Sequence, residues 1–231
     1  NGAKVIMVGD HKQLQPVGAG APFRAVAERV PTAHLQDIHR QRDAGEQRAV
    51  RDLSEGKAAE ALGHYIAKGR VSVSPTHKQA MQRIAAKVVA GRDAHGERSV
   101  VALAATNKAV ADINSAVREQ LKTKGELQGG RTYTAIRTSG ADKWDGRERQ
   151  GMAKVEFSPG DRIVSAGRND RQAPLNRSDS GCVVSVSERS VVIRLDRATT
   201  LRELYPARHD LLHGSAASTH TAHAAPLESA V

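Results

Sequence analysis

The sequence predicts an α/β protein with a parallel sheet, joined to a small module of short β-strands. In the first half of the 231-residue chain, short apolar runs alternate with helical segments that carry apolar residues on one face, as is typical of a parallel sheet. From Val155 onward, short apolar runs separated by turns replace this pattern and predict about five short strands. The chain therefore combines an α/β part with a β-module at roughly residues 150–197.

The expected elements follow from the spacing of the apolar residues. Residues 4–8 are apolar on both faces, as a central parallel strand requires. Thr76 is a suitable N-cap for the helix expected at residues 77–89. Further strands are expected at residues 35–38, 71–73 and 100–104. Helices are expected at residues 21–30, 46–53, 57–65, 77–89 and 108–122, and Gly56 separates the second of these helices from the third. After Gly125, a polar stretch leads to strands at residues 155–157, 162–165, 182–186 and 191–195, and residues 203–212 are expected as a helix or a loop.

Composition narrows the classes of function. The formal charge of +10 favours a polyanionic partner, which is DNA, RNA or a nucleotide phosphate. Aromatic residues are only 3% of the chain, so lysine, arginine and backbone groups must make most contacts to a nucleic acid. No apolar run approaches the roughly 18 residues of a membrane span, so we expect no membrane partner. The lone Cys182 excludes an internal disulfide and a cysteine-rich zinc site, and it fits a reducing, cytoplasmic compartment.

Two strings carry candidate catalytic groups. Gly9 and Asp10 end the first expected strand, and the turn after them presents Gln13, an uncharged donor and acceptor suited to a terminal phosphate and its attacking water. The second string ends the strand at residues 35–38 with Arg40, whose planar fork suits developing phosphoryl charge. The alternatives are an ordinary polar turn for the first string and a solvated basic face for the second.

These strings resemble motifs III and IV of superfamily 1 DNA helicases, in particular RecD-like enzymes and the helicase half of conjugative relaxases of the TraA, TraI and TrwC type. The resemblance implies a RecA-like sheet of the P-loop NTPase type. It implies nucleotide binding by Gly9, Asp10, Gln13 and Arg40, with catalytic roles for Gln13 and for Arg40, which would reach the γ-phosphate between two RecA-like domains.

Two further strings match family elements that hold a DNA strand. Thr106 and Asn107 end an expected strand and begin a helix, where free N–H groups bind anions, although either residue could simply be the N-cap. The string of Ser218, Thr219 and His220 resembles the start of motif V and implies further strand contacts. The Gln-Gly pair that follows in the family is replaced by residues 223–224, His-Ala, so motif V is degraded or frameshifted.

The β-module resembles the SH3-like insert of RecD-like helicases, which guides single-stranded DNA. Its arginines are candidate phosphate contacts, with ordinary surface charge as the alternative for each: Arg162, Arg168, Arg171 and Arg177. The resemblance implies that residues 1–34 end RecA-like domain 1A, 35–124 begin domain 2A, 125–200 form a linker and the insert (domain 2B), and 201–231 return to domain 2A. Four histidines near the end have spacings that could bind zinc, but the family has histidines there without metal, so we expect no metal site: His209, His213, His220 and His223.

The sequence leaves two hypotheses for function. It contains no Gly-x4-Gly-Lys-Ser/Thr phosphate loop, so we expect no tightly bound cofactor and no ATP turnover by this chain alone. It also lacks an initiator methionine and enters an apolar run almost at once, so we expect a piece of a longer protein, truncated at both ends. The first hypothesis is a fragment of a helicase that uses ATP and Mg²⁺ to move along single-stranded DNA and is joined to a relaxase domain. The second is a degenerate, non-enzymatic module that binds single-stranded DNA as a scaffold.

Overall fold

The computed structural model describes residues 4–10, 22–33, 41, 43–139, 149–166, 175–197 and 200–218. The chain divides into two units, residues 1–73 and residues 74–231, and each is described by itself. The described residues form a mixed α/β structure that includes one parallel pair of strands.

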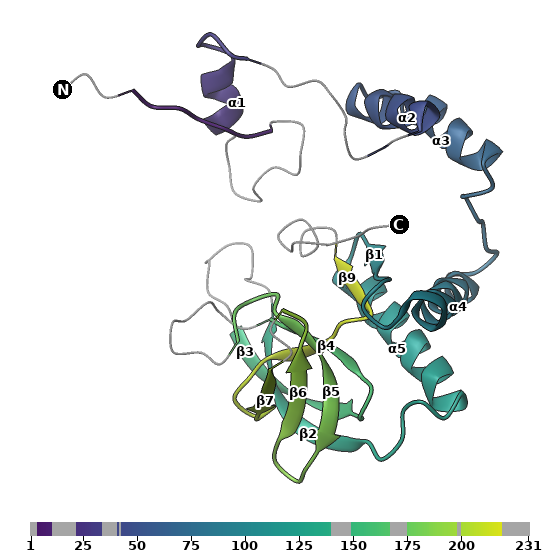
Figure 1. The fold of residues 1–231 in the computed structure, drawn as a ribbon, viewed down its shortest axis with the longest axis vertical. Coiled ribbons are helices and arrows are strands. Elements are labelled where there is room, and N and C mark those ends of the chain that lie inside the picture. Colours follow the sequence, from purple (N-terminus) through teal and green to yellow (C-terminus); the bar gives the residue numbers. More distant parts are fainter. Residues whose placement is uncertain are drawn as a thin grey trace. The chain divides into compact units, whose positions relative to one another are not determined.

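The described part of the first unit is helical (Figure 1). Its helices are α1 (Pro22–Ala27), α2 (Ala44–Ser54) and α3 (Ala58–Ala67). The Asp43 side chain caps α2 by accepting from the Glu46 N–H at 2.9 Å. The expected break between α2 and α3 is confirmed at Gly56, where a φ of 80° favours glycine. Ala49 and Ala61 are buried where the two helices pack together.

Two strands expected in this unit are wrong for the described structure. Residues 4–8 form no strand, and the side chains of Val5 and Val8 are 84% and 91% exposed. Residues 71–73 also lack regular structure, with Val73 85% exposed. A strand exists only through its hydrogen-bonded neighbours, and no other strand is present among the described residues of this unit. The expected strand at residues 35–38 lies outside the described residues.

The second unit begins with an α/β part whose helices begin within one residue of their predicted starts, although the first of them runs past its expected end at residue 89. It consists of α4 (His77–His95), β1 (Ala102–Ala104), α5 (Asn107–Thr123) and β9 (Ala216–Ser218). Thr76 caps α4, as predicted, by accepting from the Gln79 N–H at 3.2 Å. β1 pairs with β9 in parallel although the two strands are far apart in the sequence.

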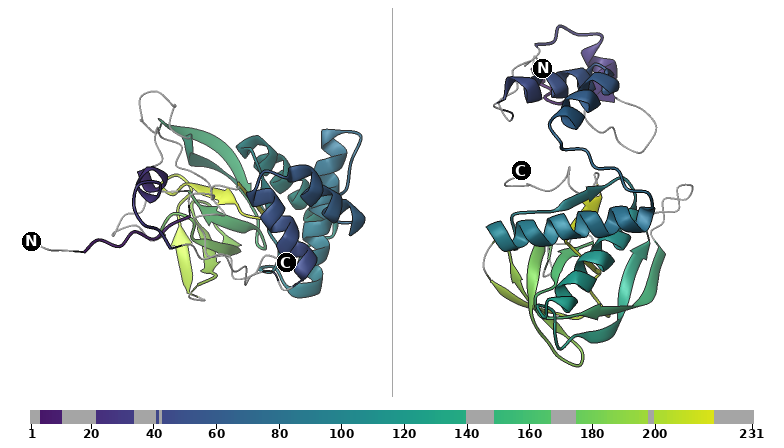
Figure 2. Two further views of the ribbon diagram at one scale, coloured as in Figure 1. Left: turned by 90° about the horizontal axis from the view of Figure 1, so that it is seen from above. Right: turned by 90° about the vertical axis from the view of Figure 1, so that its right-hand side faces the viewer.

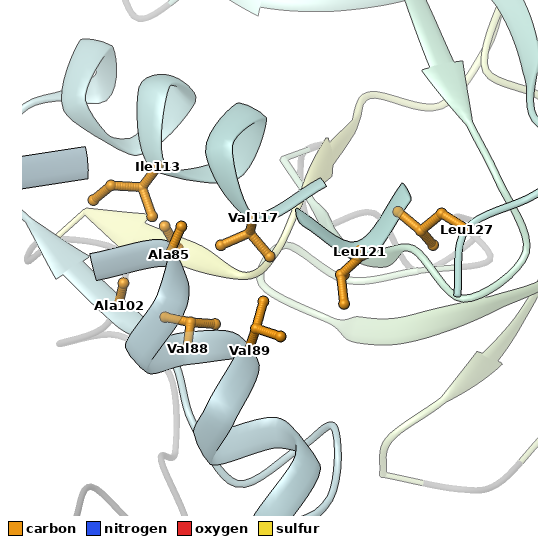
Figure 3. Packing of buried hydrophobic residues seen from close by; sticks show 9 residues of the cluster. Ala85, Val88, Val89, Ala102, Ile113, Val117, Leu121 and Leu127 are labelled. Atoms are coloured by element: carbon orange, nitrogen blue, oxygen red, sulfur yellow. The ribbon is translucent and has the colours of Figure 1, made fainter. Parts of the chain in front are cut away.

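One hydrophobic core holds this part together. Figure 3 shows alanine and valine side chains of α4 facing the apolar stripe of α5. The predicted apolar face of α5 is confirmed, because Ile113, Val117 and Leu121 are almost completely buried. The cluster is completed by Ala102 of β1, Leu127 after α5 and Ala216 of β9.

The remaining strands form a β-module on one side of α4 and α5 (Figure 2). Its strands are β2 (Arg131–Ser139), β3 (Arg149–Phe157), β4 (Arg162–Ser165), β5 (Ser180–Val186), β6 (Val191–Leu195), β7 (Leu201–Leu204) and β8 (Leu211–His213). β2 and β3 form an antiparallel hairpin, and the others form an antiparallel sheet in the order β7-β6-β5-β4-β8. A second core, which includes Tyr133, Phe157 and Leu211, lies between the hairpin and the sheet.

The module extends beyond the sequence expectation at both of its ends. The polar stretch after Gly125 contains β2, in which Tyr133 and Ala135 are buried and the threonines beside them are exposed. The helix alternative for residues 203–212 is wrong, because β7 and β8 extend the sheet to His213, past the expected boundary at residue 200. Leu204 and Leu211 cause this extension, since both are fully buried in the core of the module.

Candidate nucleic-acid interface

The carboxyl ends of β1 and β9 bring three predicted site residues to one edge. In the parallel pair, Ala104 is the partner of Ser218, so the two strands end side by side. After Ala104 the chain turns directly into α5, which begins with Thr106 as N-cap and Asn107 as first helical residue. Thr106, Asn107 and Ser218 therefore lie at the same edge, which is where α/β sheets bind their ligands.

The start of α5 has the chemistry of an anion site. The hydroxyl of Thr106 accepts from the Ala109 N–H at 3.1 Å, so the N-cap interpretation of Thr106 is confirmed. This cap uses one of the N–H groups at the helix end, and the others suit an anionic acceptor. The first turn contains no acidic residue, and the Lys108 side chain is 81% exposed.

A second capped helix start lies beside the first. His77 at the start of α4 is 3.0 Å from the Asp112 carboxylate of α5, while Lys124 after α5 binds Asp93 near the end of α4 at 2.8 Å. The two helices therefore run in the same direction, with their positive dipole ends together. The first turn of α4 also lacks acidic residues, whereas α2 and α3 carry Glu46 and Glu60 there.

Asp112 balances the charges between these two helix starts. Its carboxylate accepts from Lys108 Nζ at 2.8 Å and lies 3.0 Å from His77 Nε2. These two hydrogen bonds hold the pKa of the Asp112 carboxyl below its ordinary value, so it stays ionised at neutral pH. One carboxylate thus orients the side chains of Lys108 and His77 at these two helix starts.

Sequence reasoning did not identify His77, Lys78 or Lys108 as site residues. A signal was present, because the string Thr76-His77-Lys78 has the same form as Thr106-Asn107-Lys108. Both strings place a threonine cap and a lysine at the start of a helix. Only the packing of α4 against α5 shows that the two strings lie close together.

The other predicted site residues fall elsewhere. Gly9 and Asp10 belong to the first unit, where a Cβ on Gly9 would lie only 3.0 Å from the Phe23 ring, so a larger residue there would require the ring to shift. The remaining candidates lie outside the described residues: Gln13, Arg40, Arg168, Arg171, Thr219 and His220.

The structure corrects the expectation for Arg162. Its guanidinium binds both carboxylate oxygens of Asp196, at 2.8 and 2.6 Å, and its side chain is only 12% exposed. Ser180 donates to the same carboxylate at 2.7 Å. Arg162 is therefore part of a buried ion pair within the module and does not contact a strand phosphate. Arg177 is exposed.

Two of the four histidines with zinc-like spacing have structural roles. His209 Nδ1 accepts from the Tyr205 N–H at 3.0 Å, and His213 Nε2 lies 3.0 Å from the Glu156 carbonyl oxygen. Within the described ranges, no group of three or more histidine, cysteine or acidic side chains could hold a metal ion. In the same part of the chain, no helix has both the length and the apolar character needed to cross a bilayer.

The chain is similar in sequence to one protein family and to several known proteins. The family described as "AAA domain" matches residues 1–76. A probable conjugal transfer protein TraA of Sinorhizobium fredii is 30% identical over 230 residues, which cover 98% of this chain and 19% of that protein. The chain thus spans about a fifth of the length of this relative. An ATP-dependent RecD2 DNA helicase of Deinococcus radiodurans is 50% identical over 40 residues, 17% of this chain and 6% of that protein.

Among solved structures, a Bacteroides Pif1 bound to single-stranded DNA has a TM-score of 0.47 and 11% identity, covering 80% of this chain and 42% of that one. The resemblance seen in the sequence is confirmed by the sequence relatives, which include both TraA proteins and a RecD-type helicase. Over 98% of its length, the chain is therefore similar to a segment of TraA-type conjugal transfer proteins, and over 40 residues it is similar to a RecD-type DNA helicase.

Proposed function

We propose that this chain is part of the single-stranded-DNA-binding core of an ATP-dependent helicase within a conjugative transfer protein. The observation that carries the proposal is the convergence of Thr106, Asn107 and Ser218 at the carboxyl edge of β1 and β9. The similarity to TraA proteins over 98% of the chain supports the conjugative setting. The activity of the longer protein is inferred from these two observations together.

The chemistry of this edge suits a DNA backbone more than DNA bases. Helix N–H groups, hydroxyl groups and lysine side chains bind phosphate oxygens, which carry no sequence information. The two adjacent helix starts lack acidic residues in their first turns, and the nearby Asp112 carboxylate is paired with Lys108. A strand held in this way can move along the protein without a penalty for changing its sequence, as a translocating enzyme requires.

We assign the β-module to the SH3-like insert of RecD-like helicases and the α/β part to RecA-like domain 2A. The five-stranded antiparallel sheet and its hairpin, inserted between α5 and β9, support this assignment. On this basis the insert extends to His213, and domain 2A resumes at Ala216. Arg168 and Arg171 would extend the phosphate contacts along the module.

The nucleotide site belongs to the longer protein. By family resemblance, Gln13 and Arg40 would read the γ-phosphate, with Gly9 and Asp10 beside it. ATP and Mg²⁺ would be held by a phosphate loop and an acidic pair, and this sequence contains no phosphate loop. We therefore propose that this chain alone binds the strand but does not hydrolyse ATP.

A non-enzymatic scaffold remains the second candidate, and one feature of the sequence favours it. The Gln-Gly pair of motif V is replaced by His223 and Ala224, and a backbone that glycine permits is resisted by alanine. ATP hydrolysis stimulated by single-stranded DNA in the longer gene product would select the helicase, and strand binding without hydrolysis would select the scaffold.

The strand site is tested with Asn107→Asp. A carboxylate at the first position of α5 stabilises the helix, by about 0.3–1 kcal/mol, but repels a phosphate bound there. Fluorescence anisotropy with a labelled oligothymidylate should show several-fold weaker binding, while thermal stability is unchanged or higher. Gln128→Glu adds the same charge beyond the opposite end of α5 and serves as the matched control. Equal losses in both variants would reduce the effect to overall charge and contradict the proposed site.

A further inference from the structure

The two hydrophobic cores of the second unit meet through a polar layer. One core lies between α4, α5, β1 and β9, and the other lies inside the β-module. Three side chains of α5 at successive four-residue intervals bind the module: Asn114, Arg118 and Lys122. This spacing places them on one stripe of the helix. The helix that begins at the proposed strand site therefore also holds the module.

Arg118 makes the most buried of these contacts. Its Nε and Nη2 atoms bind the two carboxylate oxygens of Asp161 at 2.8 and 3.0 Å. Asp161 is only 2% exposed, and the Arg118 side chain is 14% exposed. A paired fork in such surroundings is directional, because both partners are planar and little solvent competes for either.

Asp161 links Arg118 of α5 to the main chain of the module. Its Oδ2 atom also accepts from the Ser158 N–H at 2.7 Å, so one carboxylate fixes the turn between β3 and β4. Arg118 Nη2 lies 3.4 Å from the Ser158 hydroxyl. The turn connects the hairpin to the five-stranded sheet, so its position sets the positions of both.

Asn114 holds the point where the chain leaves the module. Its Nδ2 atom donates to the His213 carbonyl oxygen at 2.9 Å, and its Oδ1 atom accepts from the Ala216 N–H at 2.9 Å. These bonds span the step from β8 to β9. Lys122 binds the Glu156 carboxylate at 2.7 and 2.9 Å, but both of these side chains are more than a third exposed, so solvent screens that pair.

We infer that Arg118 is a positioning residue, which through Asp161 fixes the β-module relative to the α5 start so that one DNA strand can contact both. This inference rests on the proposed strand site at Thr106 and Asn107. Two sites on one rigid body bind a long strand more tightly than a short one, because the second contact forms at a high effective concentration. Weakening the contact between Arg118 and Asp161 should lower the extra affinity for a long strand and leave the affinity of each separate site unchanged.

The experiment compares Arg118→Gln with the matched control Lys122→Gln, which loses the screened pair one turn further along the same stripe. Anisotropy titrations would use labelled oligothymidylates of about 6 and about 16 nucleotides, lengths within the range of single-strand binding sites. We expect the natural chain to bind the longer strand more tightly by about tenfold or more. In Arg118→Gln this length gain should fall several-fold while the affinity for the short strand is unchanged, and in Lys122→Gln both should persist.

Hydrogen exchange gives a readout that needs no DNA. Backbone amides of residues 158–166 should exchange about tenfold faster or more in Arg118→Gln, because a buried carboxylate loses its partner, and should be unchanged in Lys122→Gln. If Arg118→Gln does not fold, Arg118→Met combined with Asp161→Asn replaces it, since that pair leaves no buried charge unpaired.

The possible failures are distinguishable. An undiminished length gain in Arg118→Gln would overturn the positioning role and leave the strand site standing. Absence of binding to both oligonucleotides by the natural chain would overturn the proposed strand site and, with it, the DNA role of Arg118. Unchanged exchange at residues 158–166 would overturn the mechanical coupling itself.

Discussion

The Asn114 side chain accepts a hydrogen bond from the Ala216 N–H and donates one to the His213 carbonyl oxygen, each at 2.9 Å. Asn114 is only 5% exposed, and its amide makes the two main-chain hydrogen bonds that a neighbouring strand would otherwise make. The geometry explains why a polar side chain lies among the buried residues of α5, which are otherwise apolar, since both main-chain groups would be unsatisfied without it.

Asn114→Ala should therefore destabilise the chain by about 1–3 kcal/mol, the cost of leaving buried backbone groups without partners. Urea unfolding followed by circular dichroism measures the change. Gln128→Ala, at an exposed position after α5, should stay within about 0.5 kcal/mol of the natural chain. Equal stabilities of the two variants would show that water replaces the lost bonds.

The stability of the module should depend on the protonation of His213. Burial lowers the pKa of this imidazole, with the charges of Arg118 and Arg137 acting in the same direction and Asp161 in the opposite one. The folded chain therefore binds fewer protons than the unfolded chain, and stability is lost as the pH falls below the ordinary value of 6.5. Denaturant midpoints from pH 8 to pH 5 should fall less in His213→Gln than in the natural chain. A parallel fall in both would assign the effect to other groups.

Cys182 should be unreactive in the folded chain. Burial, followed by contact with Glu97, raises the pKa of the thiol to about 12, and its side chain lies within β5. Little thiolate is present near neutral pH, so alkylation should be slow. Labelling with iodoacetamide should accelerate strongly in urea, in step with unfolding. Rapid labelling of the native protein would contradict the buried position.

The chain alone should show no DNA-stimulated ATPase activity. Its sequence contains no phosphate loop, and such loops hold the β- and γ-phosphates and help to bind Mg²⁺ in phosphoryl transfer. A phosphate-release assay with and without single-stranded DNA measures this directly. Steady release that disappears in Arg40→Ala would contradict the expectation and give the chain its own catalytic site.

Binding to single-stranded DNA should be weak, insensitive to base sequence and steeply dependent on salt. Each phosphate neutralised on a single strand contributes about −0.7 to the slope of log K against log salt concentration, so three to five contacts give about −2 to −3.5. Arg168→Ala with Arg171→Ala should remove one or two contacts from this slope and leave base preference unchanged. Anisotropy titrations at several salt concentrations test both statements, and binding indifferent to salt would mean that the +10 charge only aids solubility.

Local signals made much of the α/β part predictable. Threonine caps and a regular apolar face define α4 and α5, and the end of β1 at Ala104 was expected from its apolar run. These features depend on residues within a few positions of one another. The strand β2 was missed because its outward residues are polar, although Tyr133 and Ala135 alternate with them as a half-buried strand requires.

Pairings between distant residues could not be predicted. Arg118 and Asp161 are 43 positions apart, and nothing near either one indicates its partner. Arg162 looked like a phosphate contact because exposed and buried arginines have the same local sequence signature, and only the Asp196 contact separates them. The strand expected at residues 4–8 illustrates the same limit, since an apolar run becomes a strand only when a neighbour pairs with it.

The segment between β8 and β9 restricts where the junctions of chimeric proteins can be placed. A side chain at Gly214 would place its Cβ 3.0 Å from the Ile163 carbonyl carbon, and the Gly214 N–H donates to the Arg162 carbonyl oxygen at 2.8 Å. The main-chain atoms around Gly214 therefore leave no room for a side chain at this position. Chimeras that exchange the module between relatives should keep residues 213–216 together with their own α5, and inserted tags belong in the exposed β5–β6 turn around Glu188.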